Sequence, residues 1–339
     1  MGKSPVVKVG GGQLTGRLAW TPERTEAARR YTREKTDANL AAYEAAELKA
    51  AREAVALQAS FGFGYLTDGG AGVTDIFAPY TEGLGGVKGG GNIDKYPGTR
   101  NSYFHTPVVE GDIRPTAVAL KFLFTSELKG KKKAILPSPA ALALASEDTH
   151  YSSKERLMLA FAEVLKKDVA ELAAAGYEYI QLTECFLNNE RFVKASAGLA
   201  PSFGGCVREI FDGYSGRSCV YFHAGDASGF LPLLAESGVT DLGFDFNTPA
   251  SAAKGKVRGE GVILGVQNST RKLPEEWLER EPEALAARAK EYVRELGLGE
   301  ETEVFLAPSQ DYDGLQTYPQ AKRRLESLAK AVEILEGRA

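Results

Sequence analysis

The sequence predicts an α/β fold and, within that class, a (β/α)8 TIM barrel. Short β-like runs alternate with long helical runs, and parallel strands need such helical crossovers. Roughly eight strand–helix units follow one another within 339 residues, as a closed barrel requires. Polar residues stand at the ends of the strand-like runs, where barrels keep their chemistry. We therefore expect one barrel domain over residues 1–339, with an open doubly wound sheet as the alternative.

The expected strands are short runs of apolar, β-branched and aromatic residues that end at glycine, proline or a polar side chain. The run at 218–222, for example, is closed by His223, and the run at 63–68 ends in Asp68. In chain order, we expect strands at 6–9, 63–68, 107–109, 117–124, 133–136, 177–182, 218–222, 241–245, 262–266 and 304–307.

The clearest helix is expected between Ser152 and Gly176. Ser152 and Glu155 have the spacing of a capping box, and Gly176 supplies a C-terminal stop. Between them, apolar residues at 157, 161, 164, 165, 169 and 172 recur with a helical period. Further helices are expected at about 22–60, 188–214, 229–237, 274–296 and 319–335.

The composition excludes several classes of partner. The net charge is −4, acidic and basic residues are mixed along the chain, and no long basic run with aromatics indicates nucleic-acid binding. No apolar segment approaches the length of a membrane span. The chain has three cysteines without a CxxC pair and no signal-peptide pattern, so we expect a cytoplasmic protein with buried thiols.

Two glycine-rich segments have no nucleotide-binding pattern. Gly10, Gly11 and Gly12 follow a strand, but Thr15 stands where the third glycine of GxGxxG belongs. The glycines at 89–91 lack the P-loop spacing. We therefore expect no nucleotide cofactor, and we expect the segment around 83–92 to be a flexible loop over the barrel mouth.

Polar side chains at the strand ends form the candidate site. In a barrel these residues converge on one face. His223 is the single imidazole among many carboxylates. The set therefore has two possible interpretations: a metal site with acidic partners, or a metal-free acid–base pocket. Helix caps and loop salt bridges account for part of the set. The residues are Asp68, Glu184, His223, Asp245, Asn268 and Gln310, with Asp226, Asp311 and Asp313 just beyond and Asp75 and Asp112 after other strands.

Five segments resemble the catalytic barrel of cobalamin-independent methionine synthase, within the uroporphyrinogen-decarboxylase-like superfamily. They occur in the family's order with roughly its spacing, and the resemblance spans most of the chain. It implies a (β/α)8 barrel and a diverged, single-barrel enzyme that transfers one-carbon groups. The segments are Tyr65-Leu66-Thr67-Asp68-Gly69-Gly70 with Asp75-Ile76-Phe77, Thr106 to Asp112, Ile180-Gln181-Leu182-Thr183-Glu184, Tyr221 to Gly225, and Asp313-Gly314-Leu315.

The resemblance implies a changed metal site. The family holds zinc through a His-x-Cys pair, a later glutamate and a late cysteine. His223 matches the histidine, but Gly225 replaces the first cysteine and Asp313 the last, while Asp245 lies near the position of the acid. The implied ligands are therefore His223, Asp245 and Asp313. Such a set suits zinc less well than a harder divalent metal such as iron or manganese, or no metal.

The resemblance also implies changed substrate contacts. Gly70 stands in place of a family glutamate and Thr183 in place of an aspartate, and both family acids face the ammonium group of homocysteine. We expect Gly70, Thr183, Asp75 and Gln310 to contact substrate. Asp68 and Glu184 match family positions, and Asn268 lies near the family's late histidine, so these three are the candidate catalytic residues. Related single-barrel enzymes are thought to take methyl groups from a corrinoid protein, which is the candidate partner beside a small-molecule substrate.

Three functions remain open. The first is transfer of a methyl or alkyl group to a small thiol or similar acceptor. The second is a hard-metal or metal-free barrel enzyme that performs lyase, decarboxylase or oxidative chemistry on a small acid. The third is a barrel that binds a ligand or protein without turnover, because a fold alone does not define a function.

Overall fold

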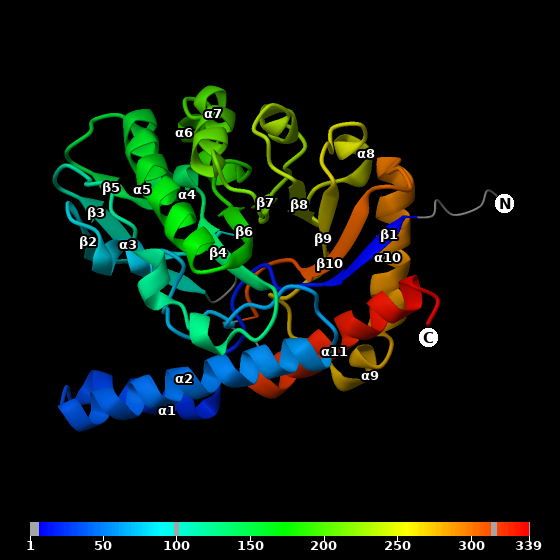
Figure 1. Cartoon of the computed structure of the whole chain (residues 1–339), viewed down its shortest axis with the longest axis horizontal. Coiled ribbons are helices and arrows are strands. Elements are labelled where there is room, and N and C mark those ends of the chain that lie inside the picture. Colours follow the sequence, from blue (N-terminus) through cyan, green and yellow to red (C-terminus); the bar gives the residue numbers. More distant parts are fainter. Residues whose placement is uncertain (1–6, 98–101, 313–316, 339) are drawn as a thin grey trace.

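A curled parallel sheet forms the centre of the molecule (Figure 1). The structure is a computed structural model of the chain and describes residues 7–97, 102–312 and 317–338. Seven parallel strands are hydrogen-bonded in the order β1-β10-β9-β8-β7-β6-β4. They are β1 (Lys8–Gly12), β4 (Lys132–Pro137), β6 (Tyr177–Glu184), β7 (Arg217–Phe222), β8 (Asp241–Asp245), β9 (Gly261–Gln267) and β10 (Glu303–Pro308). This order confirms the α/β class and the parallel pairing that the sequence predicts.

Leu66 adds one further parallel bridge at the β4 edge of the sheet. Its N–H donates to the Lys131 carbonyl at 2.8 Å, and its carbonyl accepts from the Lys133 N–H at 2.8 Å. Toward the β1 edge, a Cβ built on Gly64 would lie 3.9 Å from the Gly10 carbonyl oxygen. The run predicted as a strand at 63–68 thus lies between the two edges. The parallel sheet of the described residues contains seven of the ten predicted strands.

The helices that connect the strands along the chain pack against this sheet. Helix α5 contacts β6, α10 contacts β9, and α11 contacts β1 and β10, while α1 and α2 pack against each other. The long helices are α1 (Pro22–Arg33), α2 (Asp37–Ser60), α5 (Lys154–Ala174), α7 (Ala200–Phe211), α10 (Glu281–Leu296) and α11 (Tyr318–Leu335). Shorter elements are α3 (Ala78–Gly83), α4 (Pro139–Ala145), α6 (Val193–Ser196), α8 (Ala250–Ala253), α9 (Glu275–Leu278), and the 3₁₀ turns η1 (Ala119–Phe122), η2 (Thr125–Glu127), η3 (Glu190–Phe192) and η4 (Leu231–Leu234).

Helix α5 shows how local sequence sets an element. Its cap is Ser153, one residue after the predicted Ser152, and the Ser153 hydroxyl accepts from the Arg156 N–H. The apolar residues on its inner face, including Leu157 and Phe161, are fully buried. The chain leaves the helix at Gly176, whose φ of +80° favours glycine. Capping and an apolar stripe therefore place α5 against the sheet as the sequence predicts.

A small second sheet contains the strand predicted at 107–109 and part of the loop predicted around 83–92. It consists of β2 (Val87–Lys95), β3 (Tyr103–Val109) and β5 (Glu147–Asp148), with β2 and β3 antiparallel. The predicted strand at 107–109 therefore exists but lies outside the barrel sheet. The glycine-rich segment predicted as a loop around 83–92 forms the end of α3 and the first part of β2.

The strand predicted at 117–124 is wrong, because this segment turns through η1. Its backbone is held by Asp168, a buried carboxylate on α5. The carboxylate accepts the N–H groups of Val118 at 2.7 Å and Ala119 at 2.8 Å, and also the hydroxyl of Tyr80 at 3.0 Å. A side chain distant in sequence thus supplies hydrogen bonds that a strand would take from a neighbouring strand.

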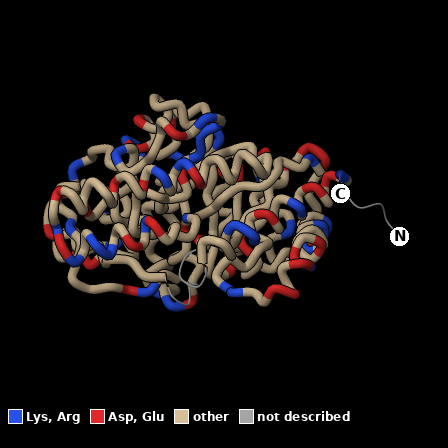
Figure 2. Tube along the Cα trace, turned by 90° about the horizontal axis from the view of Figure 1, so that it is seen from below, with Lys and Arg blue, Asp and Glu red and all other residues tan. Residues whose placement is uncertain are grey.

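Charges are interspersed over the molecule, with Lys and Arg alternating with Asp and Glu along the trace (Figure 2). Over the ranges that the structure describes, no helix combines the length and apolarity needed to cross a membrane.

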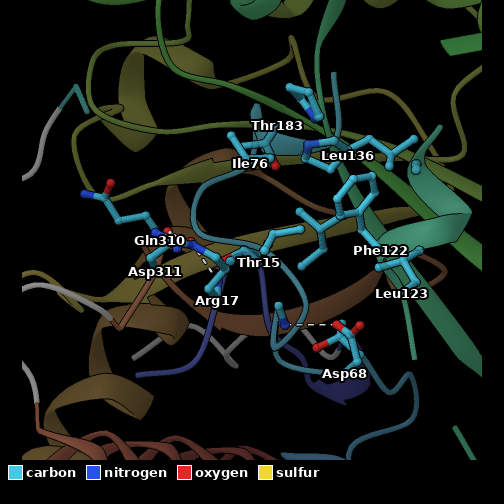
Figure 3. A pocket seen from close by; sticks show the side chains of 18 of the residues that line it. Thr15, Arg17, Asp68, Ile76, Phe122, Leu123, Leu136, Thr183, Gln310 and Asp311 are labelled. Carbon is cyan, nitrogen blue, oxygen red and sulfur yellow. Dashed lines mark hydrogen bonds and ion pairs between the residues drawn. The ribbon is translucent and has the colours of Figure 1, made fainter. Parts of the chain in front are cut away.

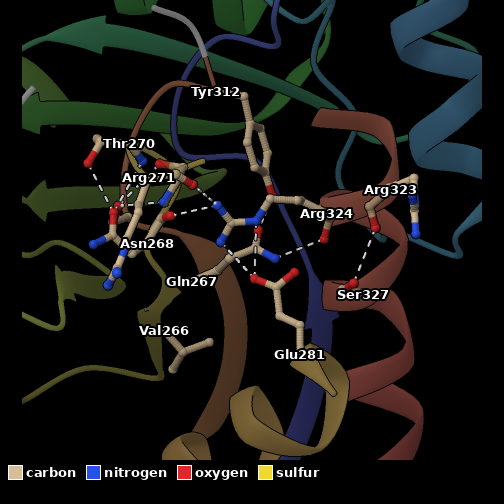
Figure 4. Close-up of polar contacts among 12 residues, drawn as sticks. Val266, Gln267, Asn268, Thr270, Arg271, Glu281, Tyr312, Arg323, Arg324 and Ser327 are labelled. Carbon is tan, nitrogen blue, oxygen red and sulfur yellow. Dashed lines mark hydrogen bonds and ion pairs between the residues drawn. The ribbon is translucent and has the colours of Figure 1, made fainter. Parts of the chain in front are cut away.

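A buried ion pair joins helices α10 and α11 near the C-terminus of the chain (Figure 4). Arg324 of α11 is 2% exposed and lies 2.7 Å from a carboxylate oxygen of Glu281 at the start of α10. Its guanidinium also donates to the carbonyl oxygens of Asn268 at 2.8 Å and Arg271 at 2.6 Å. One side chain therefore connects two helices to the loop that follows β9.

We predict that Arg324→Met lowers the free energy of unfolding by about 3–5 kcal/mol, because it leaves the Glu281 carboxylate buried without its cation. The matched control is Arg323→Met on the same helix. Arg323 is exposed and pairs with exposed Glu275, so its loss should cost about 1 kcal/mol or less. Urea unfolding of both variants measures the difference. Equal losses would contradict this role of Arg324.

Candidate active site

A cavity of about 60 Å³ opens where the strands of the sheet end (Figure 3). Its floor and walls come from the carboxyl ends of strands and the residues just beyond them, including Thr15, Asp68, Pro137, Thr183, His223 and Gln310. Apolar side chains from α3, η1 and nearby segments line the other side, including Val73, Ile76, Pro79, Ala119, Phe122 and Leu123. The arrangement is a small, largely apolar pocket with a few convergent polar groups, as small-molecule sites are built.

His223 is a buried, neutral imidazole on the wall of this cavity. It is 1% exposed, and within the described ranges its buried Nδ1 has no hydrogen-bond partner. Its ring stacks on Tyr96 at a centroid distance of 5.7 Å, and its backbone N–H donates to the Glu184 carbonyl at 3.0 Å. Burial lowers the pKa of His223 to about 3. At neutral pH this side chain therefore carries no charge.

Asp245 holds the loop after His223 and does not line the cavity. One carboxylate oxygen accepts from the Asn247 N–H at 3.0 Å. The other accepts from the Asn247 side-chain amide at 2.8 Å and from the Ala224 N–H at 3.2 Å. Burial raises the pKa of Asp245 to about 7. Ala224 has a left-handed φ of +69°, so the carboxylate stabilises a backbone conformation that a non-glycine residue rarely adopts.

The residues around His223 do not fit the family's zinc–thiolate site. A Cβ at Gly225 would lie 1.9 Å from the Asn188 carbonyl oxygen, so a cysteine side chain has no room there. The Asn188 amide fixes this packing through hydrogen bonds of 3.0 Å to the carbonyls of His223 and Gly225. No three His, Cys, Asp or Glu side chains in the described ranges are grouped to hold a metal. Asp313, the third predicted ligand, lies outside the described residues.

The two retained family acids differ in their relation to the cavity. Asp68 lines it, and its carboxylate accepts from the N–H groups of Gly70 at 2.9 Å and Phe124 at 3.1 Å (Figure 3). Glu184 is fully buried outside the cavity lining, where it accepts from Phe186, Leu187 and Ser138. Burial raises the pKa of both carboxyl groups.

Arg17 fills the space beside Gly70, the position at which the resemblance implies a family glutamate. Gly70 has a φ of +67°, and a Cβ built on it would lie 2.4 Å from Cγ of Arg17. The guanidinium pairs with Asp311 at 2.9 Å (Figure 3), so the two charges offset each other. The other replaced family acid, Thr183, lines the cavity, and its hydroxyl accepts from Gln181 at 2.9 Å. Neither position offers a free carboxylate for an ammonium group.

Of the remaining predicted site residues, one lines the cavity and the others do not. Gln310 lines the cavity. Asp75 does not, because its carboxylate accepts the Phe77 N–H at 2.9 Å in a turn. The Asn268 side chain accepts from Thr270 outside the cavity lining, in the loop that Arg324 holds. The structure thus brings Asp68, Gly70, Thr183, His223 and Gln310 to one cavity and leaves Asp75, Glu184, Asp245 and Asn268 behind its walls.

Sequence reasoning missed Lys133, a buried lysine of β4 that lines the cavity. It is 1% exposed, and its Nζ donates to Gln13 Oε1 and to the Leu14 carbonyl, both at 2.7 Å. Burial lowers the pKa of Lys133 to about 7. The signal was available: a strand alternates its faces, so one lysine of the Lys132–Lys133 pair has to point inward.

Comparisons with solved structures show that the chain has the α/β fold of known structures. Two B12-independent methionine synthase structures resemble the chain. One, from Shewanella sp. W3-18-1 in complex with selenomethionine, has 16% identity, covers 97% of this chain and 98% of its own, and gives a TM-score of 0.73. The other, a putative enzyme from Listeria monocytogenes, has 17% identity, the same coverages of 97% and 98%, and a TM-score of 0.72.

A methyltransferase from Methanosarcina mazei is more distant, with 11% identity, coverage of 97% of this chain and 94% of its own, and a TM-score of 0.52. At such identities these likenesses show the fold alone. No curated protein matches the chain.

The family itself is shown by sequence. Residues 19–201, more than half of the chain, match the family described as the cobalamin-independent synthase catalytic domain. The chain belongs to this family, which confirms the resemblance found in the sequence. It is therefore a methyltransferase-like enzyme, and the family match leaves the exact reaction open.

We predict that Gly225→Ala destabilises the protein by about 1–3 kcal/mol, because the new methyl group meets the Asn188 backbone and the loop has to move. Gly229→Ala is the matched control in the same loop region, since a Cβ there meets nothing within 4 Å. Its effect should stay within about 0.5 kcal/mol. Thermal or urea unfolding measures both. A neutral Gly225→Ala would mean that the cysteine position is open after all.

We also predict a pH-dependent contribution from Lys133. Its pKa falls from an ordinary 10.5 to about 7 in the folded chain, so between these values the unfolded chain binds the extra proton. The free energy of unfolding should therefore rise with pH in this window, by up to about 1.4 kcal/mol per pH unit. Lys133→Met removes this term. Urea unfolding of both proteins between pH 6.5 and 9.5 tests it, and a constant difference between the two would refute it.

Proposed function

We propose that this protein transfers a methyl or alkyl group to a small thiol or similar acceptor bound in the cavity. One observation supports this most: Thr183, His223 and Gln310 come from the ends of three separate strands, and together with Asp68 they line a single cavity under an apolar cover. Their convergence, in a chain of this family, is what a barrel active site requires. The apolar cover excludes water from the transferred group, which strengthens the polar interactions inside.

We propose further that residues 1–339 form one barrel domain. In this arrangement the segment around Leu66 acts as the eighth strand between β4 and β1. Closing the ring there would place Asp68 at a strand end like the other cavity residues, and it would also explain why Phe63 packs against Gly12.

The acceptor in this proposal lacks the ammonium group that the family recognises. Gly70 stands in place of the family glutamate, and the side chain of Arg17 packs against it. The guanidinium of Arg17 pairs with Asp311. The aspartate position is Thr183, a neutral hydroxyl. Each charge-assisted hydrogen bond lost in this way contributes about 1.5–3 kcal/mol. Two such losses make homocysteine a poor acceptor, and a thiol without an amino group the better one.

Each cavity residue has a distinct role in the proposal. His223, neutral and stacked on Tyr96, directs its ring toward the acceptor as a hydrogen-bonding group rather than as a charge. Asp68, whose pKa burial raises, is the candidate proton acceptor for the thiol. Glu184 is a positioning residue, because its backbone carbonyl holds the His223 N–H while its carboxylate fixes the following turn. Asn268 and Asp75 support the surrounding loops, and Gln310 contacts substrate.

Two further parts of the proposal concern the methyl donor and the presence of a metal. A corrinoid protein is the proposed methyl donor. A divalent metal held by His223 with Asp245 and Asp313 is the alternative to a metal-free site, and no step of the proposed mechanism depends on it. Metal analysis of the purified protein tests this part directly. His223→Ala should abolish whatever metal binding is found, and full occupancy in that variant would exclude His223 as a ligand.

A second function, lyase or decarboxylase chemistry on a small acid or carbonyl compound, is favoured by one specific observation. The cavity contains Lys133, an amine with no carboxylate partner among the described residues, which methyl transfer to a thiol does not use.

The transferase proposal predicts the acceptor preference. With a deuterium-labelled methyl donor, either methylcobalamin or methyl-folate, labelled methyl should reach deamino-homocysteine with a kcat/KM at least about ten-fold above that for homocysteine, by the energies given above. Thr183→Asp should move the preference back toward homocysteine, with Thr183→Val as the control for loss of the hydroxyl. Mass spectrometry of the products measures it. No transfer to any thiol, or a preference for homocysteine, would contradict the proposal.

A further inference from the structure

We propose that Lys133 is an imine-forming nucleophile for a small carbonyl compound that enters the cavity. The inference rests on the proposed function only in placing substrate in this same cavity. It adds an activity and a substrate class that methyl transfer to a thiol does not require, namely covalent capture of a small aldehyde or ketone.

Lys133 lies where a substrate carbonyl can reach it. It belongs to β4 and borders the cavity together with Ile135, Thr183 and His223. The cavity of about 60 Å³ holds roughly four to six water-sized groups, since one water needs about 10–15 Å³ on this measure. A carbonyl compound of a few non-hydrogen atoms therefore fits.

The hydrogen bonds of Lys133 match a neutral amine. A neutral amine has two N–H groups and one lone pair, whereas an ammonium has three N–H groups. Two acceptors, Gln13 Oε1 and the Leu14 carbonyl, lie 2.7 Å from Nζ. Within the described residues no ion pair involves Lys133, and the next feature around Nζ is the Tyr179 ring, with its centroid 4.9 Å away. Both donors of the neutral form are thus satisfied, and its lone pair remains available.

The charged groups near Lys133 do not raise its pKa enough to offset the effect of burial. Among the described residues, the Tyr179 ring of β6 lies closest to Nζ of the titratable groups with a measured contact, and Cys219 of β7 and Asp241 of β8 act on Lys133 electrostatically. Burial raises the pKa of the tyrosine and the cysteine, so both stay neutral. Asp241 is already paired with Arg217 at 2.6 Å. Desolvation therefore dominates, and it lowers the pKa of Lys133 to about 7, which makes a free amine abundant at neutral pH.

The chemistry balances without a further reactant. The Nζ lone pair attacks the carbonyl carbon, the C=O π electrons move to oxygen, and a proton passes from nitrogen to that oxygen. Loss of water from the carbinolamine then gives the imine, so that amine and carbonyl compound yield imine and water. When protonated, the imine withdraws electrons from the neighbouring carbon. The cavity would thereby activate a carbon–hydrogen or carbon–carbon bond next to the captured carbonyl, which is the chemistry of the second candidate function.

Reductive trapping tests the proposal on the intact wild-type protein. Acetaldehyde or acetone is added with cyanoborohydride at pH 7.5, and peptide mass spectrometry measures the extent of alkylation at each lysine. Lys133 should be alkylated at least about ten-fold faster than Lys131 and Lys132, because its amine is largely unprotonated at this pH. Lys132 is the matched control on the same strand, where its Nζ donates to the Ala175 carbonyl at 2.9 Å. An unmodified Lys133 in protein whose surface lysines react would overturn the proposal.

Two variants extend the test. Lys133→Met should lose the fast-labelled site, whereas Lys132→Met should keep it. If Lys133→Met does not fold, the lysine-by-lysine rates in the wild-type protein still decide the question. The outcome is distinguishable from the transferase assay: trapping at Lys133 without methyl transfer contradicts only the transferase, and methyl transfer without trapping contradicts only the imine.

Discussion

The parallel register of the central sheet is the constraint on which the site depends. In a parallel sheet all carboxyl ends lie at one edge, and the ladder fixes how far each strand extends there. Pro137 of β4 pairs with Thr183 of β6, which in turn pairs with Tyr221 of β7, two residues before His223. Residues from separate parts of the chain therefore meet at one level. A shift of one residue in any of these ladders would turn the polar side chains away from the cavity.

Burial then determines the chemistry of the residues that the sheet collects. Removing a group from water disfavours its charged form, and the site shows this in both directions. The imidazole of His223 and the amine of Lys133 lose affinity for protons, while the carboxyl groups of Asp68 and Asp245 gain it. Arg17 and Asp311 form an ion pair at 2.9 Å. Burial therefore disfavours charge on these side chains, and the largely apolar cavity suits an amino acid zwitterion poorly.

The α/β class and the parallel sheet were predictable from the sequence because most strands of the central sheet are compact apolar runs followed by a helix. The error at 117–124 has a physical cause, since Asp168, far away in sequence, redirects that backbone. At the site, the sequence identified His223 and Asp68 through their places at strand ends, and Thr183 through the family resemblance. It did not reveal that Gly225 is closed by Asn188 or that Arg17 covers Gly70, because both depend on contacts between segments distant in the chain. Glu184 and Asp245 were identifiable as strand-end acids, but their bonds to backbone N–H groups appear only in three dimensions.

We propose that this cavity binds an acceptor without an ammonium group, because Gly70 and Thr183 offer no carboxylate to pair with one. A calorimetric titration with a matched pair of ligands, homocysteine and deamino-homocysteine, tests it most directly, because the two molecules differ only in the amino group. The account predicts that the deamino compound binds more tightly, by about ten-fold or more. Tighter binding of homocysteine would contradict it.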